Sequence, residues 1–374
     1  MNSTTSIAAT FSVASLRAAG IVLHRWLGLS VGLVFVVAGL SGALLAYAPE
    51  ITGELFPVID GPAPSGWERH RVEVLDRTQR EHAPGEVTLI RFPNREQGAY
   101  ELYLADDTLE YRDAVSGEIV LTRTPFSDVL SFSRELHTHL LAGHAGERVL
   151  GWLGIAMLVL TATGLWLWWP RFGAWRFAFR RPRSRGLSPQ LFWWHKTVGL
   201  VSLATLFFVT LTGVAMVFYY PAQAVLTALL GGEAPEVPQT IPAGQASVID
   251  WDAVITNLDE TLPEGRTVFF YPPATPDDVL LFRKQMPGEL HPNGRSFIAM
   301  TPGGDVMHAN DATQLGAGVR AAQAIYPLHA GKAGSETWRF VVFLMGLVPS
   351  FFFVTGLWMW RLQRRRLARA SRAA

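Results

Sequence analysis

The sequence predicts a membrane α-helical protein with four transmembrane helices in a tandem two-helix duplication, and with two small α+β lobes outside the membrane. Three observations predict this fold class. Of the 374 residues, 49% are hydrophobic and only 17% are charged, which is too apolar for an ordinary soluble protein of this size. The 31 acidic residues all fall within residues 50–147 and 233–336. Short motifs at the ends of the apolar runs occur twice.

Four apolar runs are long enough to cross a hydrocarbon layer, which takes about 20 helical residues. They cover residues 21–47, 149–169, 191–220 and 338–360. Tryptophan and tyrosine gather at their ends, as is typical of helices that end at a membrane interface. A signal-peptidase-like site follows the first run, but that run is longer than a signal core of roughly 7–15 residues. We therefore expect it to remain as a span.

The basic residues predict the orientation. The loop at 170–190 and the tail at 361–374 are rich in arginine and contain no acid, and the N-terminal stretch 1–20 also lacks acids. With four spans, these three segments lie on the same side of the membrane, and the positive-inside rule places them in the cytoplasm. Residues 48–148 and 221–337 then face outward.

Each outer segment has a stretch suited to a helix, followed by short alternating strands. In the first segment the helix is expected around 67–82, and the clearest strands at 87–92, 100–104 and 119–122. In the second segment the helix is expected around 248–262, and the strands at 267–271, 279–283 and 296–300. The plain interpretation is two small α+β lobes.

The repeated motifs place four histidines at matched positions. His24-Arg-Trp-Leu-Gly28-Leu opens the first span and His195-Lys-Thr-Val-Gly199-Leu opens the third. A Leu-His pair precedes the second and fourth spans, which both end in Thr-Gly-Leu-Trp. Measured from those endings, His137 and His329 occupy the same position. Each half therefore has one histidine at the inner end of its spans and one at the outer end.

Two histidine pairs at matched depth are what two bis-histidine haems require, because each iron takes an imidazole from both sides of the porphyrin. The inner pair is His24 and His195, and the outer pair is His137 and His329. Cysteine is absent, which excludes disulfides, iron–sulfur clusters and covalent haem attachment through C-x-x-C-H. The alternative is four interfacial histidines bonded to carbonyls or lipid headgroups, although ionisable side chains near membrane depth are often functional.

Glycines accompany the inner pair. Gly28 and Gly32 share a helix face with His24, and Gly199 repeats the first relation for His195. A glycine one turn beyond the ligand lets a flat macrocycle lie against the backbone. Glycines at this spacing also permit close helix–helix contact without any cofactor. The sequence leaves both interpretations open.

The outer pair raises a question of length. A continuous helix from His137 to the end of the second span would rise about 48 Å at 1.5 Å per residue, against a hydrocarbon core of about 30 Å. The outer histidines must lie above that core, or their helices must break. The candidate breaks are Gly143, Gly146, Gly331 and Gly334.

Other polar residues near the outer pair are secondary candidates. His139 or His144 could replace His137 as the ligand. Together with three cations, these two histidines could instead meet haem propionates or an anionic substrate, or they could simply be solvated. The three cations are Arg134, Arg148 and Lys332. Four further histidines are interpreted as surface residues of the lobes, namely His70, His82, His291 and His308.

These motifs resemble the PepSY-associated transmembrane family. The matching elements follow one another along nearly the whole chain and are His24-Arg-Trp-Leu-Gly28, Glu135-Leu136-His137, Trp169-Pro170-Arg171, Trp194-His195-Lys196, Leu328-His329 and the Gly-Leu-Trp span endings. The resemblance implies PepSY-like outer lobes and a multi-pass protein of the bacterial inner (cytoplasmic) membrane with both termini in the cytoplasm. It also implies a di-haem protein that reduces ferric siderophores in the periplasm.

Carried over by position, the axial-ligand role falls on His24, His137, His195 and His329. Family members often have Arg-Ser after the outer histidine, whereas this sequence has Thr138-His139. The outer ligand set therefore keeps His139 and His144 as alternatives.

The expected function is electron transfer through two non-covalent b-type haems to a ferric siderophore. The chain lacks a G-x-G-x-x-G fingerprint at a strand–helix junction, so the donor is expected to be a separate quinol or cytoplasmic reductant. The expected surroundings are a lipid bilayer, with no nucleic-acid partner. One alternative is a siderophore or metal transporter without redox chemistry, although the spans lack the intramembrane acids that proton-coupled carriers use. Another is a membrane-anchored binding or regulatory module.

Overall fold

The computed structural model describes residues 13–170, 179–184, 186–242 and 248–373. The chain divides into two compact units. We call them the helix unit (Met1–Ala43, Leu136–Val217 and Phe343–Ala374) and the sheet unit (Leu44–Glu135 and Phe218–Val342). Each unit is described by itself.

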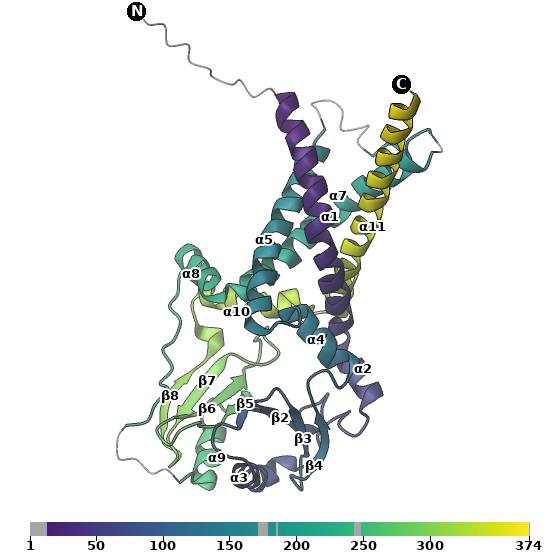
Figure 1. Cartoon of the computed structure of the whole chain (residues 1–374). Coiled ribbons are helices and arrows are strands. Elements are labelled where there is room, and N and C mark those ends of the chain that lie inside the picture. The colour runs from purple at the N-terminus through teal and green to yellow at the C-terminus, as the bar shows by residue number, and fades with distance from the viewer. Residues whose placement is uncertain (1–12, 171–178, 185, 243–247, 374) are drawn as a thin grey trace, which may run out of the picture. The chain divides into compact units, whose positions relative to one another are not determined.

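Four helices of the described chain are long and apolar enough to cross a membrane. They are α1 (Val13–Ala46), α5 (Gly143–Trp168), α7 (Leu187–Val217) and α11 (Glu336–Ala373) (Figure 1). The four predicted spans are confirmed as helices. All four helices begin before the predicted span, and α11 also extends beyond its predicted end. The third span was predicted to reach residue 220, but α7 ends at Val217 and a separate helix, α8 (Tyr219–Leu230), follows it.

Glycines allow two close contacts between these helices. A Cβ atom at Gly39 of α1 would lie 2.3 Å from the carbonyl oxygen of Gly346 on α11. A Cβ atom at Gly154 of α5 would lie 2.5 Å from the side chain of Val214 on α7. Small residues of this kind let membrane helices approach backbone to backbone. The bundle therefore depends on glycine where α1 meets α11 and where α5 meets α7.

The predicted helix breaks lie before α5 and before α11. The helix α4 (Val129–His139) ends just before α5, and Gly143 has a positive φ. The helix α10 (Ala317–His329) ends before α11, and Gly331 and Gly334 have positive φ. The predicted break at Gly146 is wrong, because Gly146 lies inside α5, where a Cβ would collide with the His139 carbonyl oxygen.

The sheet unit contains one eight-stranded antiparallel sheet in the order β4-β3-β2-β1-β5-β6-β7-β8. Its strands are β1 (Val87–Arg91), β2 (Ala99–Leu104), β3 (Leu109–Asp113), β4 (Ile119–Arg123), β5 (Arg266–Tyr271), β6 (Leu280–Gln285), β7 (Ser296–Met300) and β8 (Val306–Asn310). Pairing of Ile90 with Phe270 and of Arg91 with Phe269 joins β1 to β5. The two predicted lobes are thus the halves of one sheet, which corrects the expectation of two separate lobes.

Helices and strands follow one another along the chain in the same order in both halves. The first half runs through η1 (Trp67–His70), α3 (Arg71–Glu81), four strands and α4, with the short helix α2 (Ala48–Leu55) before them. The second half runs through α9 (Trp251–Glu260), four strands and α10, and it contains the 3₁₀ turn η2 (Ala312–Gln314) before α10. The order helix, four strands, helix is therefore the same in both halves.

The main core of the sheet unit lies between α3, α9 and one face of the sheet (Figure 1). Val74 of α3 and Leu258 of α9 are buried with Tyr100, Phe282 and other strand residues. At the surface, Arg71 of α3 donates two hydrogen bonds to Asp259 of α9 at 2.8 and 2.5 Å. Apolar burial of this kind is the main source of stability for such a layer.

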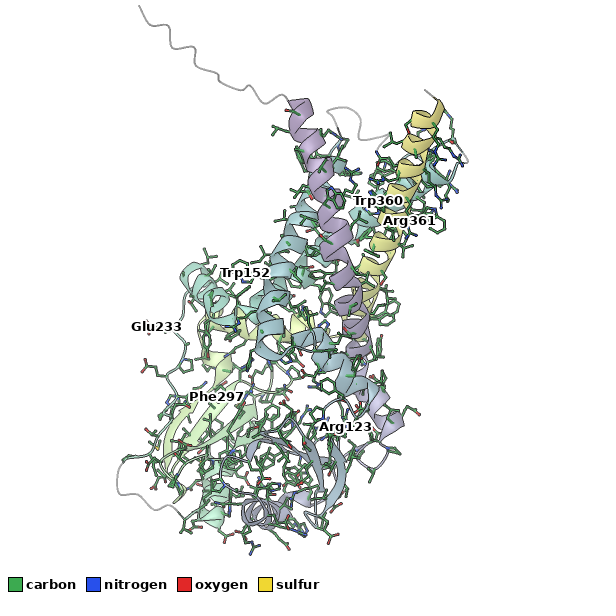
Figure 2. The ribbon with its side chains drawn as sticks, viewed as in Figure 1. Arg123, Trp152, Glu233, Phe297, Trp360 and Arg361 are labelled. Carbon is green, nitrogen blue, oxygen red and sulfur yellow. The ribbon has the colours of Figure 1, made fainter. Side chains whose placement is uncertain are left out.

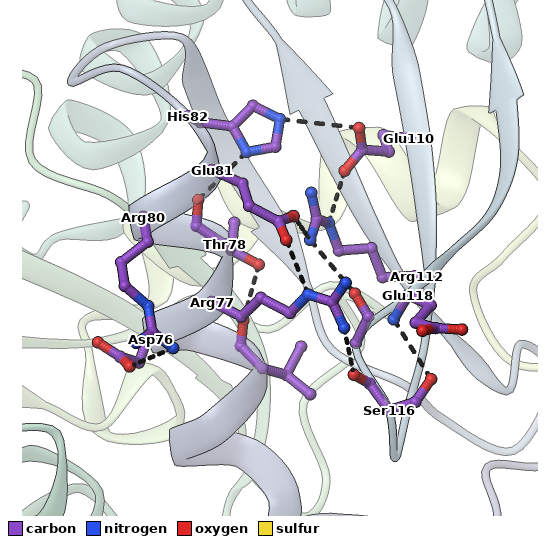
Figure 3. A network of polar contacts seen from close by, with 12 residues as sticks. Asp76, Arg77, Thr78, Arg80, Glu81, His82, Glu110, Arg112, Ser116 and Glu118 are labelled. Carbon is purple, nitrogen blue, oxygen red and sulfur yellow. Dashed lines mark hydrogen bonds and ion pairs between the residues drawn. The ribbon is translucent and has the colours of Figure 1, made fainter.

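A buried polar network ties α3 to β3 (Figure 3). Arg112 of β3 is 1% exposed, and its side chain donates to Glu110 and to Glu81, both at 2.5 Å. His82 lies 3.7 Å from Glu110, and its side chain is only 9% exposed. The prediction that His82 is a surface residue is therefore wrong, because the end of α3 packs against this charged strand. His291 is also buried, at 4% exposed.

Candidate functional site

The helix unit encloses a cavity of about 630 Å³, lined by residues of α1, α5, α7 and α11. Most of the lining side chains are apolar, and Trp360 of α11 is one of them (Figure 2). Pockets that hold cofactors and small ligands measure roughly 300–1,000 Å³ and are mainly apolar with a few placed polar groups. The cavity has the size and the composition of such a pocket.

His24 of α1 and His195 of α7 both line the cavity. Their ring centroids are 6.4 Å apart, and the ring planes make an angle of 83°. A metal–imidazole bond is about 2 Å long and the ring nitrogen lies roughly 1.1 Å from the ring centre, so two imidazoles on opposite sides of one metal have centroids roughly 6 Å apart. The observed separation fits a single metal ion held between the two rings.

Each of these imidazoles is held by a threonine of a neighbouring helix. His24 Nδ1 lies 3.1 Å from Thr163 Oγ1, and the Thr163 hydroxyl itself donates to the Leu160 carbonyl at 2.9 Å. Because the hydroxyl hydrogen is used in that bond, the oxygen accepts the proton on Nδ1. We therefore assign the tautomer with Nε2 unprotonated, which is the form that binds a metal.

The same arrangement occurs at the second histidine. His195 Nδ1 lies 2.8 Å from Thr355 Oγ1, and Thr355 donates to the Phe351 carbonyl at 2.8 Å. A hydrogen bond to the second ring nitrogen fixes the orientation of a metal-binding histidine. The tautomer and the orientation of the ring are therefore fixed in the same way at both inner histidines.

The glycine that follows each threonine lies beside an imidazole ring, and the fit is tight only at Gly164. A Cβ atom at Gly164 would lie 3.1 Å from His24 Cε1, and one at Gly356 would lie 4.0 Å from His195 Cε1. Sequence reasoning used the repeated Thr-Gly-Leu-Trp motifs only to align the span ends, and missed the role of Thr163 and Thr355. Both threonines belong to a motif that is repeated together with the histidines, and this repeat could have identified them as part of the site.

Gly28, Gly32 and Gly199 line the cavity, and helix packing does not require glycine at any of them. A Cβ atom there would meet its nearest neighbour at 3.9, 3.6 and 3.8 Å respectively, which is ordinary van der Waals contact. Gly39 and Gly346, in contrast, have no room for a Cβ atom. The structure thus separates the two interpretations of the glycines: close helix contact at Gly39 and Gly346, and the wall of a cavity at the other three.

The polar lining of the cavity is cationic. Arg17, Arg25 and Lys196 line it, and no acidic residue does so among the described residues. Arg25 donates to Gln363 at 3.4 Å, but its buried Nε has no partner. A buried unpaired donor beside these cations suits a ligand that carries carboxylates. A planar macrocycle with acidic substituents therefore fits the histidines, the glycines and the cations together.

The predicted outer ligand His137 lies against α1 in the helix unit. Its Nδ1 donates to the Ala38 carbonyl at 2.7 Å, and a Cβ at Gly42 would come within 2.5 Å of its ring. Burial lowers the pKa of His137 below its usual value, so the imidazole is neutral at pH 7 and able to bind a metal. Its predicted partner His329 is the last residue of α10 in the sheet unit, and the pairing stays a prediction.

The secondary candidates differ in exposure. The side chain of His144 is 92% exposed and lies 3.4 Å from Glu147, so it is held less firmly than His137. His139 is partly buried, with its ring 6.3 Å from the ring of His144. Arg134, Arg148 and Lys332 are all exposed, and Lys332 donates to the Tyr326 hydroxyl at 3.2 Å. Among the three histidines, burial and the hydrogen bond favour His137.

Comparison with known proteins agrees with this fold. Residues 21–363 match the family model of the PepSY-associated TM region. The chain belongs to this family. The match covers almost the whole of both units, and it confirms the resemblance predicted from the short motifs. None of the curated proteins compared with the chain matches it.

The two kinds of glycine predict different responses to a methyl group. On α1, Gly39→Ala should destabilise the protein by about 1–3 kcal/mol, because the Cβ meets a backbone oxygen that cannot move freely. Gly28→Ala should leave the helix packing intact, since alanine also favours the helix. Melting temperatures in detergent test this, with visible spectra recorded in parallel to detect loss of a bound chromophore. Equal losses of melting temperature with unchanged spectra would show that helix packing requires both glycines.

Proposed function

We propose that this membrane protein transfers electrons across the cytoplasmic membrane through two non-covalently bound b-type haems and reduces a ferric siderophore on the periplasmic side. The observation that carries the proposal is the inner pair. The ring centroids of His24 and His195 lie 6.4 Å apart, and both rings line a cavity of about 630 Å³. Each ring is oriented by a threonine hydroxyl. A bound haem would supply reversible one-electron chemistry at this position.

The protein's own groups at the inner site have distinct tasks. His24 and His195 would hold the haem iron through Nε2, and Thr163 and Thr355 keep Nδ1 protonated and the rings in place. The glycines of α1 and α7 leave room for the macrocycle. The cations of the lining, with the unpaired Nε of Arg25, would bind its carboxylates. The apolar remainder of the cavity excludes water.

The outer site is proposed for His137 and His329. Each histidine ends or nearly ends a short helix, α4 or α10, that precedes a long helix. In the sheet unit α10 is fixed closely to α8, because the Gly318 amide donates to the Gly231 carbonyl at 2.9 Å, and a Cβ at Gly318 would touch the backbone of α8. His329 is therefore carried by a well-packed helix. A firm support of this kind suits an axial ligand.

The orientation follows from the basic segments. Residues 170–190 and 361–374 are placed in the cytoplasm by their arginines, so the inner pair lies toward the cytoplasmic side and the sheet unit in the periplasm. The electron donor is a quinol or a cytoplasmic reductant. Each electron delivered reduces one ferric ion of the substrate to ferrous iron. Hard oxygen ligands hold ferrous iron less tightly than ferric iron, so the reduction releases the metal from the siderophore.

Substitution of the histidines tests the haem sites. The purified protein should show a reducible bis-histidine spectrum with two haems per chain. His24→Ala and His329→Ala should each remove about half of the haem, and the double variant should remove nearly all of it. His144→Ala, which removes an exposed histidine near the outer site, is the matched control and should retain the full spectrum. A protein without a Soret band after haem-supplemented expression would contradict the proposal.

The threonines provide a more selective test of the inner site. Thr163→Val keeps the shape of the side chain and removes the acceptor for His24 Nδ1. Loss of such an orienting group typically weakens metal binding about 10- to 100-fold. Inner haem should therefore transfer faster to apomyoglobin, and its midpoint potential should shift. Thr161→Val is the control, because Thr161 also lines the cavity but its hydroxyl donates only to the Leu158 carbonyl. Identical behaviour of the two variants would exclude the orienting role.

Reoxidation of the reduced protein separates the reductase from a transporter without redox chemistry. Protein reduced with dithionite is mixed with a ferric siderophore and a ferrous chelator. The reductase should return to its oxidised spectrum while one ferrous chelate forms for each electron lost. His329→Ala should slow this reaction much more than His144→Ala. A stable reduced spectrum in the presence of several ferric complexes of different chemistry would favour the transporter.

A further inference from the structure

The sheet unit contains a group of cations apart from the four proposed ligands. Arg283 lies on β6, Arg295 lies just before β7, and Lys332 follows α10. All three act electrostatically on the buried His291. We call Arg283, Arg295, Lys332 and His291 the cationic cluster. It is built entirely from residues of the sheet unit.

Arg283 is fixed, and among the described residues it forms no ion pair, although Glu289 acts on it electrostatically. It is 7% exposed, and it donates to the Gly294 carbonyl at 2.5 Å and to the Tyr271 hydroxyl at 2.8 Å. Its guanidinium lies 5.3 Å from the centroids of both Phe269 and Phe297. These partners satisfy the N–H groups and the flat faces of the guanidinium, but they are neutral. A buried cation without an ion-pair partner is unusual in a folded protein.

Arg295 adds a second charge with an unused donor. Its Nε is buried and has no hydrogen-bond partner. Burial and the charge of Arg283 both lower the pKa of Arg295. A buried unpaired donor costs roughly 1–3 kcal/mol, so such a group in a native protein needs an explanation. A bound anion is the simplest group that would satisfy it.

Lys332 and His291 complete the cluster on the α10 side. Lys332 Nζ lies 3.2 Å from the Tyr326 hydroxyl, and the Tyr326 ring stacks on His291 with centroids 5.1 Å apart. His291 Nδ1 accepts from the Asn293 amide at 3.2 Å, so the ring proton is on Nε2. Burial and the three cations lower the pKa of His291 to about 2, and the ring therefore remains a neutral donor.

One carboxylate, that of Glu289, acts electrostatically on Arg283 and Arg295. Glu289 accepts from the Met286 amide at 2.8 Å and so closes the turn after β6. Burial raises the pKa of Glu289. Among the described residues, Glu289 forms no ion pair with the three cations. With three cations and one carboxylate, the cluster keeps an excess of positive charge, contributed by β6, the β6–β7 turn and the segment after α10.

We propose that the cationic cluster binds the carboxylate of an anionic ligand. Two sources of a carboxylate are compatible with its position, since Tyr326 and Lys332 flank His329 in sequence by three residues on either side. One is a soluble anion such as a carboxylate-bearing ferric complex, and the other is a propionate of the outer haem. The assignment of the ligand as substrate or haem rests on the proposed function, whereas anion binding by the cluster does not.

The test measures citrate and ferric citrate binding by titration calorimetry on the full-length protein in nanodiscs of zwitterionic lipid. Arg295→Gln combined with Lys332→Gln should weaken binding about 10- to 100-fold, because two charge-assisted hydrogen bonds are lost. The control combines Arg266→Gln with Arg320→Gln, which removes two exposed charges of the same unit. It should change binding less than about threefold, as expected for screened surface charges. Arg295→Lys keeps the charge and should retain most of the affinity, and its melting temperature shows that the fold survives.

The same samples distinguish the two sources. Weaker citrate binding with unchanged haem content assigns the cluster to a soluble carboxylate ligand. Loss of about half the haem, together with a wild-type protein that does not bind citrate, assigns it to a propionate. Unchanged citrate binding and unchanged haem content in Arg295→Gln/Lys332→Gln would overturn the proposal, as would equal losses in the control. The citrate measurement remains informative if the protein proves to contain no haem.

Discussion

The hydrogen bond from an imidazole Nδ1 to a threonine hydroxyl is the contact on which the inner site depends. Inside a membrane helix a polar side chain must find its partners within the protein, because lipid offers none. Thr163 and Thr355 each donate to a carbonyl of their own helix, so they can only accept from the histidine. This one constraint fixes the tautomer and the orientation of His24 and His195.

The same helices carry two kinds of glycine for opposite physical reasons. At Gly39 and Gly346 the missing side chain brings two backbones together, and at Gly28 and Gly199 it keeps a volume open. The helix α1 takes part in both, because Gly39 lies in the close contact with α11 and Gly28 lines the cavity. The bundle can therefore hold a wide cavity without loosening as a whole.

Much of the fold and of the inner site could be predicted from the sequence, because hydropathy, charge and the repeated histidines are local signals. The four spans, the family and the pairing of His24 with His195 were all predicted. The β1–β5 junction was not, since it joins strands far apart in the chain. The strand β3 was missed because Leu109–Asp113 alternates buried charged residues with apolar ones. The burial of His291 likewise depends on a long-range contact, the ring of Tyr326.

The continuous sheet has a consequence for symmetry. Strand registers pair Leu102 with Ile90 in the first half and Phe282 with Phe270 in the second, so Tyr103 stands where the second half has Arg283. Two identical subunits joined in this way would present every surface feature twice. A single chain is free of that requirement and can differentiate one half while the other keeps a structural role. The two halves therefore differ in charge at a matched position, where the second half has Arg283 and the first has Tyr103.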